Sequence, residues 1–268
     1  MCRKRALLAT VLAPLLMLGS LAQASDAPAQ AAANAPRKAS PAQRAEARRA
    51  DPLARAAFWG AEFETDGRDA EAGVALAQAL RALGRYEDAA ATVAKVLTVA
   101  PDNIEGLLES ARTQIARGQG FYAIEPARRA ATLAPRDWRA HSLLGVAYEQ
   151  AQRDEEATAA HRQAVALAPN EAAPNANYAM HLAASGNLPA AEAQLRRAAA
   201  LPSSTIQIRQ NLALVIGLQG RIGEAEKLAR QDLPPESVAN NLAWLRAATG
   251  QGPSTIQPRS WEAMKSGG

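Results

Sequence analysis

The sequence predicts an all-α fold: a solenoid of about five helix-turn-helix repeats with a capping helix at each end. The first observation is that prolines recur every 34 residues, at Pro101, Pro135 and Pro169. The second is a glycine column with the same spacing, formed by Gly84, Gly118, Gly186 and Gly220, with Gln152 in the remaining position. The third is a pair of small-residue columns in phase with both, formed by Ala77, Ala111, Gly145, Ala179 and Ala213 and by Ala89, Ala123, Ala157, Ala191 and Ala225. A fixed period in this range is typical of stacked helical hairpins.

Residues 1–24 predict a secretory signal peptide. A basic start at residues 3–5 precedes an uncharged apolar run over residues 6–21, and small residues at 22–24 provide a cleavage site. The run is short for a membrane span and Pro14 interrupts it. We therefore expect a cleaved signal and an exported chain, and membrane association would be only indirect unless the signal stays uncleaved.

The charge and the cysteine content exclude two classes of function. Cleavage after Ala24 would remove three positive charges from a chain of net charge +4, which leaves the mature protein nearly neutral. We therefore expect no nucleic-acid partner. The only cysteine, Cys2, lies in the signal, so the mature chain would carry neither a disulfide nor thiol chemistry.

Residues 25–50 predict a disordered linker between the signal and the array. The segment is rich in Ala, Pro, Gln and Arg and has no large apolar residue, so it cannot bury enough surface to offset its ordering entropy. We expect transient helix at most, over residues 42–50. Asp51 and Pro52 then provide a capping side chain and a first-turn proline, which predicts that an N-terminal capping helix starts there.

The array is expected to cover residues 52–250, and each repeat reads as a helix A, a tight turn and a helix B. The glycine column ends helix A in a left-handed cap, and the proline column stops helix B. The repeats are placed at about 70–103, 104–137, 138–171, 172–205 and 206–235. A C-terminal capping helix is expected at 237–249 and a tail at 251–268.

Nothing in the sequence predicts an active site. The three histidines, His141, His161 and His181, lie 20 residues apart, but they form neither an i, i+4 ligand pair nor a His-Glu-x-x-His motif. The glycines are explained as helix stops, and no Gly-x-Ser-x-Gly nucleophile motif occurs. We expect a non-enzymatic protein with no cofactor, no metal site and no small-molecule substrate.

The 34-residue hairpin resembles the tetratricopeptide repeat (TPR). In that family the concave face is lined by the second, fifth, ninth, twelfth and thirteenth residues of each helix A. The resemblance implies a protein-binding groove, and its expected contact residues are Arg81, Arg112, Arg139, Gln150, Met180, Gln210, Leu214 and Leu218. Fifth-position residues expected on the same face are Val74, Leu108, Ser142 and Ala176.

The two halves of this implied groove differ in character. The N-terminal half is charged, while the C-terminal half is apolar with Met180 as an adaptable contact. Such a surface suits an amphipathic helix or an extended peptide with apolar anchors. The alternative is that Met180, Leu214 and Leu218 pack against the next repeat and contact no partner.

Several local runs also resemble the TadD family of Tad (tight adherence) pilus-assembly proteins. They cover about residues 52–250 in order: Phe58-Trp59-Gly60, Asp137-Trp138-Arg139, Arg209 to Val215, Gly217 to Arg221, Glu224 to Glu226, Asp232-Leu233-Pro234 and Asn241 to Arg246. The resemblance implies a periplasmic adaptor for Flp-type (type IVb) pilus assembly and secretion, with pilus or secretin components as partners and a pilotin-like role toward the secretin.

The sequence departs from that family in one respect. Many members are lipoproteins, but here no cysteine follows the apolar run and Ala24 stands in its place. We therefore expect a soluble periplasmic protein without a lipid anchor. A second hypothesis remains open, in which the array serves an envelope enzyme system such as cytochrome maturation or polysaccharide synthesis.

Overall fold

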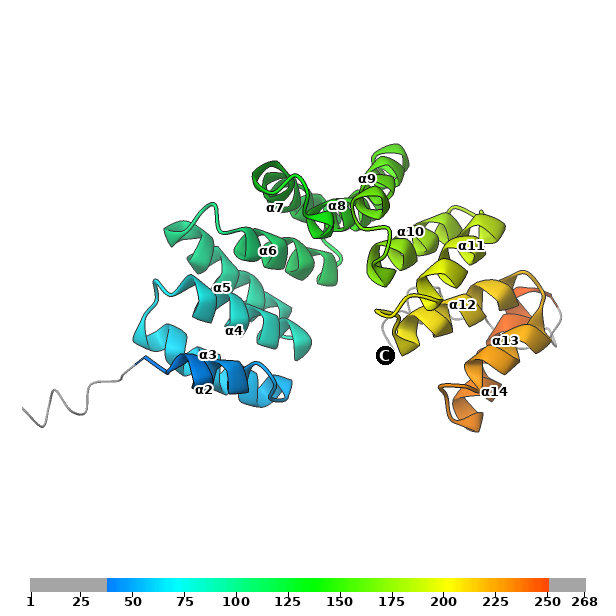
Figure 1. Ribbon diagram of the computed structural model, residues 1–268, viewed down its shortest axis with the longest axis horizontal. Helices are drawn as coiled ribbons and strands as arrows, with labels where there is room; N and C mark the ends of the chain where they lie inside the picture. The colour runs from blue at the N-terminus through cyan, green and yellow to red at the C-terminus, as the bar shows by residue number, and fades with distance from the viewer. Residues whose placement is uncertain (1–37, 251–268) are drawn as a thin grey trace, which may run out of the picture. The chain divides into compact units, whose positions relative to one another are not determined.

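A computed structural model describes residues 38–250 of the chain, and regular structure in this part is entirely helical. The predicted signal, the linker up to residue 37 and the tail at 251–268 lie outside the described residues. The all-α prediction is confirmed (Figure 1). The helices are α2 (Pro41–Ala47), α3 (Pro52–Thr65), α4 (Ala70–Ala82), α5 (Tyr86–Val99), α6 (Ile104–Ala116), α7 (Gly120–Leu133), α8 (Trp138–Gln150), α9 (Asp154–Leu167), α10 (Ala172–Ala184), α11 (Leu188–Ala199), α12 (Ile206–Leu218), α13 (Ile222–Ala229) and α14 (Pro235–Ala248).

The helices pack as five consecutive hairpins. In each hairpin the A helix (α4, α6, α8, α10 or α12) packs against the B helix that follows it. Each B helix also contacts the next A helix, and consecutive A helices contact one another, as α8 and α10 do. Helix α14 extends this pattern by one unpaired A-type helix. The predicted solenoid of about five repeats, closed by a helix at each end, is therefore confirmed.

The glycine column has the backbone conformation that the sequence predicts. Gly84, Gly118, Gly186 and Gly220 all have φ between 71° and 82°, and Gln152 occupies the same region at φ 58°. The residue after each of them donates its N–H to a carbonyl five residues back, as from Arg85 to Leu80 at 2.9 Å. This is the bond of a Schellman cap, which a left-handed residue makes possible. Each helix A is thus ended by its own sequence.

The small-residue columns bring the two helices of each hairpin into close contact. Ala77 and Ala89 are fully buried in the first repeat, and the equivalent alanines in the later repeats are buried as well. Helices with small side chains at the contact can approach closely, so little large apolar volume is needed to close the interface. This explains how a chain with only 4% aromatic residues builds a continuous core.

The N-terminal end differs from the expectation, because the linker does not extend to residue 50. Helix α2 begins at Pro41 with a capping box made by Ser40 and Gln43. Arg44 is buried against α3 and α4, where it forms ion pairs with Glu62 at 2.6 Å and Asp69 at 2.7 Å. The sequence of this segment has no amphipathic pattern that would predict a docked helix, because α2 docks mainly through a charged side chain and a few small ones. Asp51 caps α3 as expected, by accepting from the amides at positions 53 and 54.

The C-terminal end is closed by contacts between residues far apart in sequence. Helix α14 begins two residues before the expected position, at Pro235. Leu245 packs so closely on Gly217 of α12 that a Cβ there would lie 2.4 Å from the leucine side chain. Arg209 at the start of α12 holds Asp232 with two hydrogen bonds of 2.8 and 2.5 Å. The B helix of the fifth repeat, α13, is shorter than the B helices of the other repeats, and these contacts join α12 to the part of the chain that follows α13.

Candidate binding surface

The charged half of the expected groove is built from internal ion pairs. Arg81 on α4 reaches across to Glu109 on α6, with Nε 2.6 Å from a carboxylate oxygen, and Arg112 approaches the same carboxylate at 3.6 Å. Glu109 is fully buried, and the two guanidinium groups are its ionic partners. Burial lowers the pKa of Arg112, Glu109 opposes this effect, and Arg81 adds to it.

Arg139 continues the same pattern one repeat further. At the start of α8 it holds Asp137 at 2.6 Å and Glu105 of α6 at 2.7 Å. Burial by itself would raise the pKa of Asp137, but hydrogen bonds from the side chain and amide of Arg139 keep this pKa below its usual value. The same contacts raise the pKa of Arg139, with its hydrogen bond to Asp137 as the largest cause.

These contacts change the character of the predicted surface. The three arginines, which the sequence offers as partner contacts, pair inside the chain with Glu109, Glu105 and Asp137. Two of these pairs, Arg81 with Glu109 and Arg139 with Glu105, link the A helices of successive repeats. A partner would meet a surface of mixed and nearly balanced charge.

One expected column of contact residues is buried. Val74, Leu108, Ser142 and Ala176, the fifth-position residues of four A helices, have at most 6% of their surface exposed. Their placement on an accessible groove was wrong, because neighbouring A helices pack closely enough to cover this column. The column is nevertheless lined up along the array, since each member occupies the same place in its repeat.

The apolar half also contributes mainly to packing. Met180, Leu214 and Leu218 are half-buried, and all three pack against the core cluster formed by α10 to α14. This agrees with the alternative in which they support the next repeat. Gln210 is half-buried on α12. Gln150 is exposed, and its amide nitrogen donates to the carbonyl of Ile115 at 3.1 Å.

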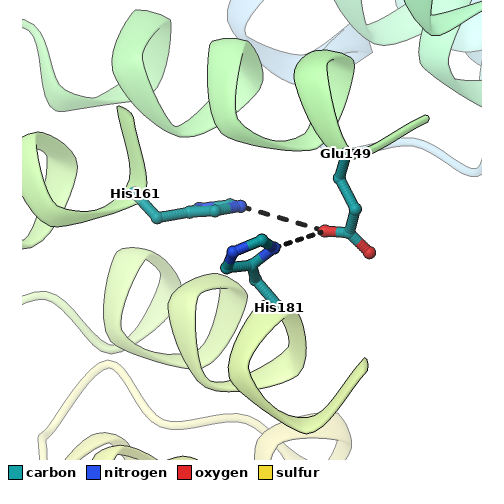
Figure 2. Close-up of side chains that lie close together, drawn as sticks. All are labelled: Glu149, His161 and His181. Carbon is teal, nitrogen blue, oxygen red and sulfur yellow. Dashed lines mark ion pairs between the residues drawn. The ribbon is translucent and has the colours of Figure 1, made fainter. Parts of the chain in front are cut away.

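The structure also brings together side chains that sequence spacing had separated. His161 from α9 and His181 from α10 lie with their ring centroids 5.2 Å apart. One carboxylate oxygen of Glu149 lies 3.9 Å from Nε2 of His161 and 3.8 Å from Nδ1 of His181 (Figure 2). Both histidines are buried, whereas the Glu149 side chain is 25% exposed.

Among residues 38–250 this is the group of three side chains whose donor atoms are close enough to hold a metal ion, all within 4.8 Å of one another. No sequence motif predicted that the histidines meet, yet the fold brings two of the three together; His141 is not part of the group. The 20-residue spacing of the histidines does not indicate that their side chains meet, because it does not place them on one face of a single helix. Their places in the repeat do indicate it, because the equivalent pairs Ala127 with Ala147 and Leu195 with Val215 also share a core cluster.

The helices of residues 38–250 are all too short or too polar to cross a lipid bilayer. Two segments match family models described as tetratricopeptide repeat, at residues 70–103 and 140–173. A comparison with curated proteins found no match.

Solved structures of repeat proteins are similar to this chain. The crystal structure of TTC0263, a thermophilic TPR protein in Thermus thermophilus, is 26% identical with a TM-score of 0.59, over 66% of this chain and 98% of that one. PilF of Pseudomonas aeruginosa is 18% identical with a TM-score of 0.55, over 69% and 87% of the two chains. MamA from Desulfovibrio magneticus RS-1 is 24% identical with a TM-score of 0.50, over 58% and 88%. The last two likenesses show the fold alone. Together with the two repeat models, these findings show that the chain contains TPR-like repeats and has a TPR-like helical fold.

Proposed function

We propose that this chain is a non-enzymatic periplasmic adaptor of a Tad/Flp-type pilus-assembly system, and that it binds one or more proteins of the secretion machinery. The repeat fold supports a binding role, because a stacked array presents an extended surface to a partner. The signal-like residues 1–24 support export. The family-like runs of the sequence support the choice of system.

The observation that carries the proposal furthest is the way the C-terminal family-like runs fit together. Arg209 and Asp232 come from two of these runs and pair directly, at 2.5 and 2.8 Å. Gly217 and Leu245 come from two others and pack against each other. Residues that are remote in sequence but matched in space support a resemblance to one particular C-terminal structure, beyond the resemblance to a generic repeat.

The proposed contact surface is the exposed part of the A-helix side. Since the arginines are paired and the apolar residues are half-buried, the side chains most available to a partner are exposed ones such as Gln150, Ala173 and Gln207. A substitution there disturbs little of the core. We therefore prefer Gln207→Arg as a probe over a charged substitution at Met180 or Leu214, which would also destabilise the packing.

The test is a clean deletion in the native bacterium, complemented with the wild type, with Gln207→Arg or with Gln163→Arg. The last variant makes the same change at an exposed position on a B helix, α9. We expect the deletion to lose Flp-type pili and assembled secretin, the wild type and Gln163→Arg to restore both, and Gln207→Arg to restore them only partly. Unchanged pilus number and secretin assembly in the deletion would refute the role in pilus assembly.

Export is tested separately by fusing residues 1–24 to a reporter that is active only outside the cytoplasm. Activity together with release of the mature chain into the soluble periplasmic fraction is the expected result. A chain that stays in the cytoplasm would contradict the localisation, and a chain retained in the membrane fraction would indicate an uncleaved signal.

A further inference from the structure

Two histidines occupy core positions that other repeats fill mainly with apolar residues. The equivalents of His161, found by steps of 34 residues, are all buried and apolar: Val93, Ala127, Leu195 and Ala229. The equivalents of His181 are also buried, and three of the four are apolar: Ala79, Thr113, Ala147 and Val215. A buried imidazole in such a place costs free energy unless its nitrogens find partners.

The nitrogens of the two rings are largely without hydrogen-bond partners. Nε2 of His181 lies 2.8 Å from the hydroxyl oxygen of Thr158. The other three ring nitrogens, Nδ1 of His181 and both nitrogens of His161, are buried and make no hydrogen bond to any residue between 38 and 250. Buried polar atoms are almost always paired in native proteins, so three in one cluster call for an explanation.

An ion pair with Glu149 does not provide that explanation. Burial is the largest cause that lowers the pKa of His161, to about 3, and the neighbouring His181 contributes to the same shift. The separation of 3.9 Å between Nε2 of His161 and the Glu149 carboxylate is too long for a hydrogen bond. A neutral imidazole with an unused lone pair is the form that binds metal ions.

The surrounding residues hold both rings in place. The small-residue column has glycine at Gly145, and a Cβ there would lie 2.5 to 2.6 Å from three atoms of the His161 ring. Tyr178 stacks on this ring, at 6.2 Å between centroids and an interplanar angle of 26°. Where Nε2–H of His181 donates to Thr158, the lone pair of Nδ1 is directed toward Glu149. A hydrogen bond of this kind is what usually orients a metal-ligating histidine.

We propose that Glu149, His161 and His181 form a binding site for a divalent first-row transition ion of the zinc class. Two imidazole nitrogens and one carboxylate oxygen are a ligand set that suits Zn²⁺, with a fourth position left for water. Zinc ligands in a tetrahedral site are about 3.3 Å apart, whereas the Glu149 oxygen lies 3.8 and 3.9 Å from the two imidazole nitrogens and the whole group spans at most 4.8 Å. Binding would therefore draw all three ligands closer together, and Glu149, the partly exposed ligand at the end of α8, marks the route of entry.

The test uses the mature full-length chain without an affinity tag, treated with chelator and titrated at neutral pH with Zn²⁺ and with Co²⁺ as a spectroscopic probe. We expect one equivalent to bind, a rise in Tm of roughly 5 °C at a hundredfold excess over Kd, and the visible absorption of tetrahedral Co²⁺. His141→Ala, which removes the histidine outside the cluster, is expected to bind like the wild type.

The ligand variants are His161→Leu, His181→Val and Glu149→Ala, which introduce the residues found one repeat later at Leu195, Val215 and Ala183. Because the next repeat folds with these residues, the variants are expected to fold, and far-ultraviolet circular dichroism checks this. Each should weaken Zn²⁺ binding by at least about a hundredfold, and Thr158→Val by about tenfold. A wild-type affinity no tighter than that of the triple variant, for either ion, would overturn the proposal.

Discussion

The array buries polar side chains both at its N-terminal end and at the boundary between its third and fourth repeats, and the two places handle them differently. At the N-terminal end, Arg44 is surrounded by acceptors and bonds to Glu62, Asp69 and Glu71. At the repeat boundary, three of the four ring nitrogens of His161 and His181 have no hydrogen-bond partner. Burial is similar, but the pairing is complete in one place and incomplete in the other.

This difference in hydrogen-bond pairing distinguishes side chains with a structural role from side chains that are candidates for a functional one. A buried charge with matched partners is explained by the fold, because the contacts that it makes fix helix α2 against α3 and α4. A buried imidazole without partners destabilises the metal-free fold and is retained at a cost. The comparison therefore indicates that a ligand would stabilise the protein most at the histidine cluster. The role of each of the two places can be tested by substitution.

The largest effect on stability is expected at the N-terminal end, where the buried Arg44 is paired with carboxylates. Arg44→Ala leaves Glu62 and Asp69 buried without their main partner, so the docking of α2 should weaken by about 3 kcal/mol. The measurement is amide hydrogen exchange over residues 41–47. Arg48→Ala is the control, since Arg48 bonds to Glu71 but is exposed, and it should cost no more than about 1 kcal/mol. Equal effects in the two variants would refute the claim that burial decides the strength of this contact.

The next effect tests the packing beneath the histidines. Gly145→Ala places a methyl group against the His161 ring and should destabilise the protein by about 2 to 3 kcal/mol in chemical denaturation. Adding His161→Leu should recover most of this loss, because Ala179 and Leu195 occupy the same two positions in the next repeat. If the double variant is no more stable than Gly145→Ala alone, the methyl group clashes with something other than the ring.

The stability contributed by the ion pairs at the N-terminal end should also depend on pH. Burial opposes ionisation of Asp69, but hydrogen bonds from Arg44, Lys38 and the Ala72 amide lower its pKa from 3.8 to about 2. A carboxyl with a lowered pKa stabilises the folded state above its unfolded pKa, and this contribution of about 2 kcal/mol is lost as pH falls from about 4 to 2. Denaturation of wild type and Asp69→Asn at pH 5, 4, 3 and 2 should show a difference that shrinks toward acid. A difference that stays constant with pH would count against the ion pair.

The smallest expected effect is a gain in stability when the two buried histidines are replaced. His161→Leu together with His181→Val removes the unpartnered nitrogens and should raise the stability of the metal-free protein by about 1.5 kcal/mol. Chemical denaturation in the presence of chelator measures it, with His141→Ala as the control that changes a histidine elsewhere. A loss of stability would mean that the two rings already satisfy their nitrogens through buried water.

The repeat itself could be predicted closely from sequence, because its signals are local. A left-handed residue at Gly84 or Gln152 and a proline at Pro101 act through their own backbone, so they mark helix ends wherever they occur. Helix α2 could not be predicted in this way, since it has no apolar stripe and depends on Arg44 meeting acidic residues from two other helices. The groove was predicted only in part, because the exposure of Val74 or Ala176 depends on how closely successive A helices pack.

The sequence by itself thus determined the period, the helix ends and the order of the hairpins, all of which follow from short-range conformational preferences. Only the tertiary structure decided which side chains meet: Arg81 with Glu109, Arg209 with Asp232, and Glu149 with His161 and His181. These contacts join residues on different helices, and their distances depend on how the helices pack against one another. A spacing along the chain does not measure those distances.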